Sequence, residues 1–352
     1  MPNNILITGA AGFIGSNFVR YWLSQHPSDV ITALDALTYA GNRASLSGLD
    51  VRFVHANVND YESTAAVIEA NAINLIVHFA AETHVDRSID APDVFLETNI
   101  LGTHNLLKAA RAYWQSEGQI GSNTLHFHHV STDEVYGSLA QDEPGFDESS
   151  RFAPNSPYAA TKASADHLVR AYFQTYGMPM TISNCSNNYG PFQYSEKLIP
   201  RLIINSLLGR SMPIFGDGNQ IRDWLFVDDH CRAIDRIISA GVKGEVYNVG
   251  GNEELSNLSV IDFVCSSLDR RFRADQNLRL RFPNSPCANA KSASTLKFHV
   301  PDRAGHDRRY AVNANKLKVQ LGFDPLVRFE QGIEETISWY LAHVNWWDLQ
   351  IT

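Results

Sequence analysis

The sequence predicts an α/β protein with a doubly wound parallel sheet and a smaller C-terminal domain. Short β-branched or aromatic runs recur along the chain, and longer amphipathic stretches separate the early ones. Strands and helices that alternate in this way indicate parallel strands joined by crossover helices. After Gly190 the pattern changes: Gly, Pro and Asn become frequent, and polar segments such as 270–281 interrupt it. This change predicts the second domain.

The expected strands, in chain order, are residues 5–8, 30–34, 51–55, 75–79, 125–130, 180–183 and 245–249. The expected helices are residues 12–24, 61–70, 99–114 and 158–176, each with apolar residues at helical spacing. We assign residues 1–190 to the sheet domain, with 223–250 returning to it, and residues 191–222 and 251–352 to the smaller domain. The segment 269–298 receives no role.

Composition narrows the class of protein. The 352 residues suffice for two domains. The net charge of −9 comes without any block of like charges, which argues against nucleic-acid binding. Four scattered cysteines form no C-x-x-C pair, so we expect neither a disulfide framework nor a zinc site, and a reducing compartment. The apolar start lacks a basic flank, and no apolar run could span a bilayer. We expect a cytoplasmic protein without membrane partners.

A glycine-rich turn follows the first expected strand directly. Gly9, Gly12 and Gly15 allow a tight turn, close approach of the backbone to a pyrophosphate, and close packing of the next helix. Asp35 follows the last glycine by about twenty residues, at the end of the second strand, where a carboxylate can accept both ribose hydroxyls. These features predict a Rossmann dinucleotide site that prefers NAD to NADP.

A tyrosine and a lysine lie one helical turn apart, at Tyr158 and Lys162. A phenol has an ordinary pKa of about 10, so it is a poor base near neutral pH. A neighbouring ammonium and a nicotinamide charge favour the phenolate, which can take the proton of a substrate hydroxyl as hydride leaves. Ser131 and Thr132, at a strand end, can bind the same oxygen.

Two adjacent carboxyl groups, Asp133 and Glu134, follow directly. A simple alcohol dehydrogenase needs no second acid and base, whereas an enzyme that eliminates water needs both. Like charges held close together raise one pKa, which suits one partner to the acid role. An exposed acidic turn is the alternative reading of this segment taken alone.

Nine stretches together resemble the dTDP-glucose 4,6-dehydratases, nucleotide-sugar dehydratases of the extended short-chain dehydrogenase/reductase type. The matching stretches are residues 8–16, 35–42, 79–88, 131–137, 158–162, 184–191, 196–198, 220–224 and 302–310. The resemblance implies a carbon–oxygen lyase of deoxysugar biosynthesis, which converts dTDP-glucose to dTDP-4-keto-6-deoxyglucose and water. It also implies NAD as the cofactor and a nucleotide sugar as the substrate.

The resemblance further implies roles for individual residues. Thr132 and Tyr158 would bind the 4-hydroxyl, with Tyr158 as the oxidation base beside Lys162. Asp133 would protonate the leaving 6-hydroxyl, and Glu134 would take the proton from carbon 5. The cofactor would contact Gly9, Gly12, Phe13, Ile14, Gly15, Asp35, Ala36, Leu37, Thr38, Asn57, Val58, Phe79, Ala80, Ala81, Glu82, Thr98, Tyr158, Lys162 and Asn188. The sugar nucleotide would contact Thr83, Thr132, Asn187, Lys197, Leu198, Pro213, Ile214, Phe215, Arg222, Asn257, Asp302, Arg303, Ala304, Gly305 and His306.

Three positions depart from the family's usual pattern. Asn57 replaces an Asp near the adenine, and its amide oxygen can still accept that hydrogen bond. Thr83 replaces a Ser and keeps a hydroxyl. Ala304 replaces a Pro, which predicts a less rigid loop beside the nucleotide.

The resemblance implies a homodimer that pairs the helices 99–114 and 158–176 in a four-helix interface. We expect no metal site, since His126, His128 and His129 lack a third ligand on one face. Three alternatives of the same fold are a UDP-glucose 4,6-dehydratase, a 4-epimerase and a decarboxylase. An alternative of another class is a catalytically silent NAD-sensing protein, which has no reason to keep Tyr158, Lys162 and both carboxyl groups.

Overall fold

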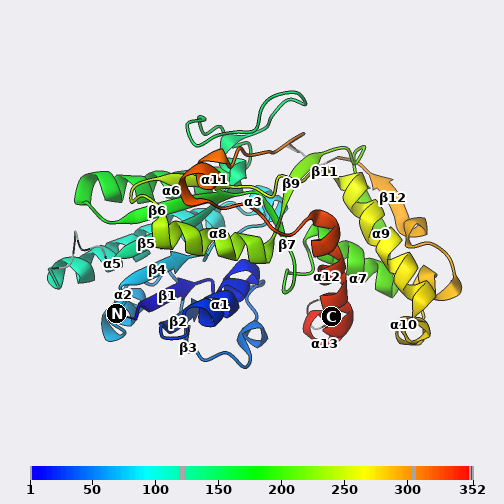
Figure 1. The fold of residues 1–352 in the computed structure, drawn as a ribbon, viewed down its shortest axis with the longest axis horizontal. Coiled ribbons are helices and arrows are strands. Elements are labelled where there is room, and N and C mark those ends of the chain that lie inside the picture. The colour runs from blue at the N-terminus through cyan, green and yellow to red at the C-terminus, as the bar shows by residue number, and fades with distance from the viewer. Residues whose placement is uncertain are drawn as a thin grey trace.

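Seven parallel strands form the main sheet of this computed structural model, which describes residues 2–118, 120, 122, 124–302, 307–348 and 350. The order across the sheet is β10-β6-β5-β4-β1-β2-β3 (Figure 1). The strands are β1 Asn4–Thr8, β2 Val30–Asp35, β3 Arg52–His55, β4 Leu75–His78, β5 His126–Thr132, β6 Met180–Cys185 and β10 Val246–Val249. The order reverses between β1 and β4, and ligands of open α/β sheets bind outside the carboxyl ends of strands at such a reversal.

The predicted fold class is confirmed. All seven strands expected from the sequence lie in this sheet, with boundaries that differ by one or two residues. One difference concerns the site. β5 continues to Thr132, two residues beyond the expected end, because Ser131 and Thr132 still pair with Asn184 and Cys185 of β6. The adjacent carboxyl groups therefore begin at the first residue after the strand.

Helices cover both faces of the sheet. α1 (Phe13–Gln25) and α8 (Val227–Ala240) pack on one face, over a core that includes Ile5, Ile7 and Val77 of the strands. α2 (Tyr61–Ala70), α5 (Thr103–Ser116) and α6 (Pro157–Tyr176) pack on the other, over a core that includes Leu6, Ile76 and Phe127. Alternate residues of one strand face opposite sides, so both faces of a doubly covered strand are apolar.

The expected helix 99–114 begins differently from the prediction. A π-helical segment, η2 (Leu96–Gly102), precedes α5, and the short helices α3 (Val85–Asp90) and α4 (Asp93–Phe95) lead into it. Inside the segment, the Asn99 amide donates to the Glu82 carbonyl at 3.0 Å and accepts from the Glu82 N–H at 2.8 Å. π-Helical turns occur often at functional sites. The π-helical turn here holds Glu82 in the loop that follows β4.

The rest of the chain builds a smaller body beside the carboxyl ends of the strands, around α9 in Figure 1. It contains a three-stranded sheet in the order β11-β9-β7 and a two-stranded sheet of β8 and β12. Its strands are β7 Asn187–Tyr189, β8 Met212–Phe215, β9 Ile221–Phe226, β11 Glu254–Ser256 and β12 Lys297–Val300. Its helices are α7 Leu198–Leu208, α9 Asn257–Ala274, α10 Gln276–Arg281, α12 Phe329–Ala342 and α13 Val344–Asp348.

The chain crosses between the two bodies several times. Residues 223–226 belong to β9 of the smaller sheet, whereas α8 and β10 lie in the large body. α11 (Asn315–Leu321) also returns, and packs against α8 and β10. The segment 269–298 forms the end of α9, then α10 and two short 3₁₀ turns, η4 (Pro286–Asn289) and η5 (Ala293–Leu296). Two further 3₁₀ turns are η1 (Arg43–Leu46) and η3 (Asp133–Tyr136).

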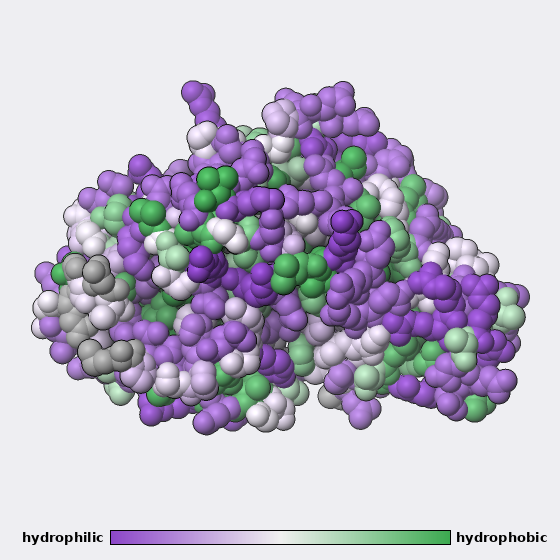
Figure 2. Space-filling view, in the orientation of Figure 1, coloured by the Kyte–Doolittle hydropathy of each residue, from purple (hydrophilic) through white to green (hydrophobic). Residues whose placement is uncertain are grey.

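The face of the molecule seen in Figure 2 is mainly hydrophilic, with hydrophobic residues in small separate patches. Within the part of the chain that the structure describes, no helix combines the length and apolar character needed to cross a membrane.

Gly332 on α12 allows that helix to approach β7, and we predict that Gly332→Ala destabilises the protein. Gly to Ala inside a helix usually stabilises by about 0.5–1 kcal/mol. Here the added Cβ would lie 2.3 Å from the Tyr189 hydroxyl oxygen and 2.9 Å from its ring. Because Tyr189 is fully buried, overpacking should outweigh the gain and cost about 1–3 kcal/mol. Chemical denaturation measures the change, with Glu330→Ala on the exposed side of the same helix as the control. Unchanged or increased stability of the Ala variant would contradict the prediction.

Candidate active site

A cavity of about 310 Å³ opens at the carboxyl ends of β1, β2, β4 and β5, where the strand order reverses. Eighteen of the nineteen residues expected at the cofactor line it, all except Leu37. Of the residues expected at the substrate, Thr83, Thr132, Asn187 and Lys197 line it. Both carboxyl residues, Asp133 and Glu134, lie at the same cavity.

The glycine turn leaves no room for side chains. Gly9 has a φ of +67°, and a Cβ there would lie 2.7 Å from the Ala80 nitrogen at the end of β4. A Cβ at Gly15 would lie 2.2 Å from the Gly9 carbonyl oxygen. Gly12 is the N-cap of α1, and no side chain caps that helix. The turn therefore presents backbone N–H groups and a helix N-terminus to the cavity, which suits a bound phosphate.

Asp35 ends β2 at the rim of the cavity. Its carboxylate accepts from the Ala11 N–H at 2.9 Å and from the Leu37 N–H at 2.7 Å. Burial raises the pKa of Asp35, and these two backbone hydrogen bonds lower it. Through them the carboxylate joins the glycine turn to the loop that follows β2. The Leu37 side chain itself stays outside the cavity lining.

The Thr132 hydroxyl connects the two carboxyl residues. It accepts from the Glu134 N–H at 3.3 Å and donates to the Asp133 carboxylate at 3.4 Å. Asp133 is 2% exposed, and burial, together with the negative charge of Glu134, holds the pKa of Asp133 well above its ordinary value. A carboxyl group whose pKa is raised in this way is suited to act as an acid. The alternative reading of the segment, an exposed acidic turn, is wrong because Asp133 is buried.

Tyr158 and Lys162 both face the cavity from α6. Burial raises the pKa of Tyr158 well above its ordinary value, and a hydrogen bond with the Thr132 side chain opposes that shift. Burial lowers the pKa of Lys162 to about 8. The Lys162 ammonium donates to the Val130 carbonyl at 2.8 Å.

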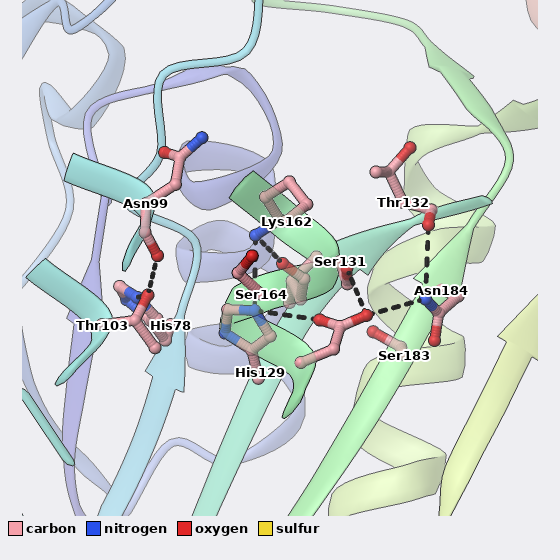
Figure 3. Close-up of polar contacts among 12 residues, drawn as sticks. His78, Asn99, Thr103, His129, Ser131, Thr132, Lys162, Ser164, Ser183 and Asn184 are labelled. Atoms are coloured by element: carbon pink, nitrogen blue, oxygen red, sulfur yellow. Dashed lines mark hydrogen bonds and ion pairs between the residues drawn. The ribbon is translucent and has the colours of Figure 1, made fainter. Parts of the chain in front are cut away.

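A chain of buried hydrogen bonds fixes the helix that carries Tyr158. The Asn99 amide donates to the Thr161 hydroxyl at 2.9 Å, and that hydroxyl donates to the Tyr158 carbonyl at 2.7 Å. The Thr103 hydroxyl donates to the Asn99 carbonyl at 2.7 Å and lies 2.9 Å from His78 Nε2 (Figure 3). The π-helical segment thus links β4 to α6.

The other residues expected at the substrate lie outside the lining of this cavity. Leu198, Pro213, Ile214, Phe215, Arg222, Asn257 and Asp302 occupy β8, β9, the starts of α7 and α9, and the residue pair after β12. Arg222 donates to the Asp307 carbonyl at 2.9 Å and stacks over the Tyr310 ring. Gln220 donates to the Asp302 carboxylate at 3.1 Å. Arg303, Ala304, Gly305 and His306 lie outside the described residues.

Further residues at the cavity were not expected from the sequence. They are Leu34, Tyr39, Ala40, Gly41, Ala56, Val130, Cys185, Ser186, Gln193, Tyr194 and Glu196, whereas Ser131, expected beside Thr132, also lines it. The Arg87 guanidinium stacks over the Tyr39 ring at 3.8 Å and pairs with Glu196 at 3.0 Å, which joins two loops at the rim. Several of these residues belong to the stretches that carry the resemblance, which is the one signal that could have found them.

The three histidines of β5 bind neighbouring side chains. His126 and His128 both lie 2.8 Å from the Thr181 hydroxyl of β6, and His129 Nε2 lies 3.3 Å from the Asp166 carboxylate. Burial holds the pKa of all three well below the ordinary value for histidine. Over the described ranges of the chain, no group of three or more His, Cys, Asp or Glu could hold a metal ion.

Comparisons with known proteins match this architecture over almost the whole chain. The family model described as GDP-mannose 4,6 dehydratase matches residues 6–336. The dTDP-glucose 4,6-dehydratases of Salmonella typhimurium and Neisseria meningitidis are each 46% identical to this chain, over 97% of it and 94% of their own length. The crystal structure of DesIV, a dTDP-glucose 4,6-dehydratase from Streptomyces venezuelae with NAD bound, aligns with a TM-score of 0.86 and 41% identity, over 99% of each chain. A UDP-glucose 4-epimerase from Thermotoga maritima aligns with a TM-score of 0.82 and 25% identity, over 97% of this chain and 99% of its own.

Ionisation of the buried Asp133 carboxyl group should lower the stability of the folded protein. We therefore predict that Asp133→Asn stabilises the protein at alkaline pH. The pKa of Asp133 is raised in the folded protein, so the folded state binds this proton more tightly than the unfolded state does. Stability is therefore lost as the pH rises through the folded pKa. The amide resembles the protonated acid and escapes that loss, so the gain should be larger at pH 8 than at pH 5, in buffers matched for ionic strength. Thermal unfolding of both forms at the two pH values measures the difference. An equal gain at both pH values, or none, would mean that Asp133 is not held protonated.

Proposed function

The chain belongs to the dTDP-glucose 4,6-dehydratases within the GDP-mannose 4,6-dehydratase family, and from this membership we infer its function. It is an NAD-dependent enzyme that converts dTDP-glucose to dTDP-4-keto-6-deoxyglucose and water. The observation that carries this inference is the cavity itself, because it brings the glycine turn, Tyr158 and both carboxyl residues together.

The residues around the glycine turn fit a dinucleotide. Side chains at Gly9 or Gly15 would collide with backbone, so the turn can approach a pyrophosphate closely. We propose that Asp35 binds the adenosine ribose, and that Asn57 and Val58 border the adenine. When bound, NAD accepts the hydride of carbon 4 and later returns it to carbon 6. A carboxylate at position 35 disfavours the 2′-phosphate of NADP, by like-charge repulsion.

We propose that the chain's own residues move the protons as follows. Tyr158, with Thr132 holding the same oxygen, takes the proton of the 4-hydroxyl while the hydride leaves. The resulting ketone acidifies the neighbouring C–H bond, and Glu134 removes the carbon-5 proton. Asp133 donates its proton to the 6-hydroxyl, which departs as water. Once the hydride is back on carbon 6, Glu134 returns a proton to carbon 5, which completes the 4-keto-6-deoxy sugar. The raised pKa of Asp133 supports this acid role.

The sugar nucleotide fits the second group of residues in this proposal. Thr83, Asn187 and Lys197 border the cavity, and Leu198, the strand β8, Arg222, Asn257 and Asp302 follow beside it. A guanidinium such as Arg222 donates parallel hydrogen bonds to phosphate oxygens. We further propose residues 303–306 at the nucleotide. The same proposal divides the chain into cofactor-binding residues 1–190 and 223–250 and substrate-binding residues 191–222 and 251–352. In the fold, β7 and residues 223–226 belong to the smaller body and α11 belongs to the large one.

The test incubates the purified protein with dTDP-glucose and follows the product by mass spectrometry. The expected product has lost one water, and UDP-glucose in parallel should react more slowly. A methyl group in an apolar pocket is worth about 10- to 200-fold in specificity. An isomer of unchanged mass would indicate an epimerase instead, and equal rates on both nucleotides would overturn the thymidine preference.

The Glu134→Gln variant should still reduce bound NAD, but its rate of water elimination should fall by about 10²–10⁴-fold. It should also incorporate little solvent deuterium at carbon 5. Normal deuterium incorporation by this variant would assign the base elsewhere.

We propose that the protein forms a homodimer through η2, α5 and α6. Apolar side chains on and beside these helices are exposed: Ile89, Val94, Leu96, Leu101 and Tyr176. Among them Leu101 of η2 is 55% exposed. Exposed apolar patches of this kind mark interfaces.

Leu101→Glu should therefore dissociate the dimer, as measured by sedimentation equilibrium. Val319→Glu is the matched control, since Val319 is 82% exposed on α11, away from these helices. A monomeric wild type, or dissociation by the control alone, would reject this interface.

We also propose a reducing, cytoplasmic location. The four cysteines are buried and form no disulfides, which supports it.

A further inference from the structure

Asp166 is a buried carboxylate on the helix that carries the proposed oxidation base. It follows Lys162 by one helical turn, as Lys162 follows Tyr158, so the three side chains lie on one face of α6. Asp166 is 3% exposed and does not line the cavity. Asp166 was not among the residues expected at the site, and it takes no part in the mechanism proposed above.

Two strands supply hydrogen bonds that hold the Asp166 carboxylate. The Ser131 hydroxyl donates to it at 2.9 Å and the Asn184 amide donates at 3.1 Å. The same Asn184 amide lies 3.3 Å from the Thr132 carbonyl. Figure 3 shows Ser131, Asn184 and Lys162 gathered between α6 and the ends of β5 and β6. The second carboxylate oxygen lies 3.3 Å from His129 Nε2.

The groups that face Lys162 are mostly neutral. They are His78 of β4, His129 of β5, Cys185 of β6 and Asp166 of α6. Burial holds the pKa of both histidines well below the ordinary value, and burial raises the pKa of the Cys185 thiol to about 12. Asp166 is also near His167 and Tyr136. The carboxylate is therefore the principal negative charge beside the buried ammonium.

We propose that Asp166 is a positioning residue for the oxidation step, which acts by keeping the Lys162 ammonium charged beside Tyr158. This proposal rests on the function inferred above. A buried ammonium without a counter-ion tends to lose its proton. The hydrogen bonds from Ser131 and Asn184 aim the carboxylate and favour its ionised form. Lys162 in turn favours the Tyr158 phenolate, which accepts the proton of the substrate hydroxyl.

The electrostatics agree with this geometry. Burial lowers the pKa of Lys162 to about 8, and Asp166 is the first group that opposes this shift. Burial raises the pKa of Asp166 to about 6, and Lys162 is the first group that opposes that shift. Between these two values the pair carries both charges.

The experiment measures single-turnover reduction of bound NAD after mixing holoenzyme with dTDP-glucose, from about pH 5 to about pH 10, which brackets both pKa values. In the wild type the rate should decline on the alkaline side as Lys162 loses its proton. Asp166→Asn keeps the shape but removes the charge, so this decline should begin at least one pH unit lower. A one-unit fall reduces the charged fraction at pH 8 from about one half to about one tenth, or roughly fivefold.

Two further variants separate charge from shape. Asp166→Glu retains the charge and should keep the alkaline decline at the wild-type pH, even if the rate falls. Asp229→Asn is the matched control, because Asp229 is a buried carboxylate on α8 that accepts from the Leu326 and Val327 N–H groups, outside this site. It should leave the pH profile unchanged.

A double-mutant cycle covers the case in which Asp166→Asn folds poorly, since removing one of two opposite buried charges is destabilising whereas removing both is tolerated better. In the Lys162→Met background, Asp166→Asn should have no further effect on the rate. An added loss there, or an unshifted profile for Asp166→Asn, overturns the role through Lys162. If the wild type reduces its NAD on mixing but releases no dehydrated product, the dehydratase function fails and the Asp166 proposal is still decided by the profiles.

Discussion

The burial of ionisable side chains at the carboxyl ends of β5 and β6 is the constraint on which this structure depends. Asp133, Lys162 and Asp166 are all nearly inaccessible to water, and each has a pKa displaced from its ordinary value by that burial. A buried charge is costly unless a partner or hydrogen bond compensates it. The surrounding strands and helices supply those partners, and in doing so fix the geometry of the site.

The compensation is spread over several elements. β5 supplies the Val130 carbonyl to Lys162, and β6 supplies the Asn184 amide to Asp166. The π-helical segment before α5 supplies Asn99, which bonds the chain after β4 and also Thr161 of α6. Each of these polar groups is itself buried, so a shift of one element would leave several groups without partners. The elements that carry Asp133, Tyr158 and Lys162 are therefore held rigidly, as preorganised catalysis requires.

The opposite constraint operates at the glycine turn. There the requirement is space, since side chains at Gly9 and Gly15 would collide with the backbone of neighbouring elements. The Asp35 carboxylate accepts from two N–H groups of the flanking loops, so the turn and the end of β2 form one unit. The glycine turn offers backbone N–H groups at one end of the cavity, and titratable side chains lie at the other end. This arrangement suits a dinucleotide whose phosphates bind at the turn and whose nicotinamide ring reacts at the far end.

Local chemistry explains what the sequence determined by itself. The seven strands were predictable because each contains a short run with β-branched or aromatic residues, and the glycine turn was predictable because its spacing has a steric cause. The π-helical start of α5 was not predictable, because it depends on hydrogen bonds between Asn99 and Glu82, seventeen positions apart in the chain.

The adjacency of Asp133 and Glu134 could be read from the sequence, but only the burial of Asp133 in the structure removed the alternative of an exposed turn. Asp166 shows the same limit: its spacing from Lys162 is visible in the sequence, whereas Ser131 and Asn184 reach it only when β5 and β6 pair beneath α6. Tertiary structure alone decides which titratable groups are desolvated together, because desolvation depends on every neighbour and not on the residue itself.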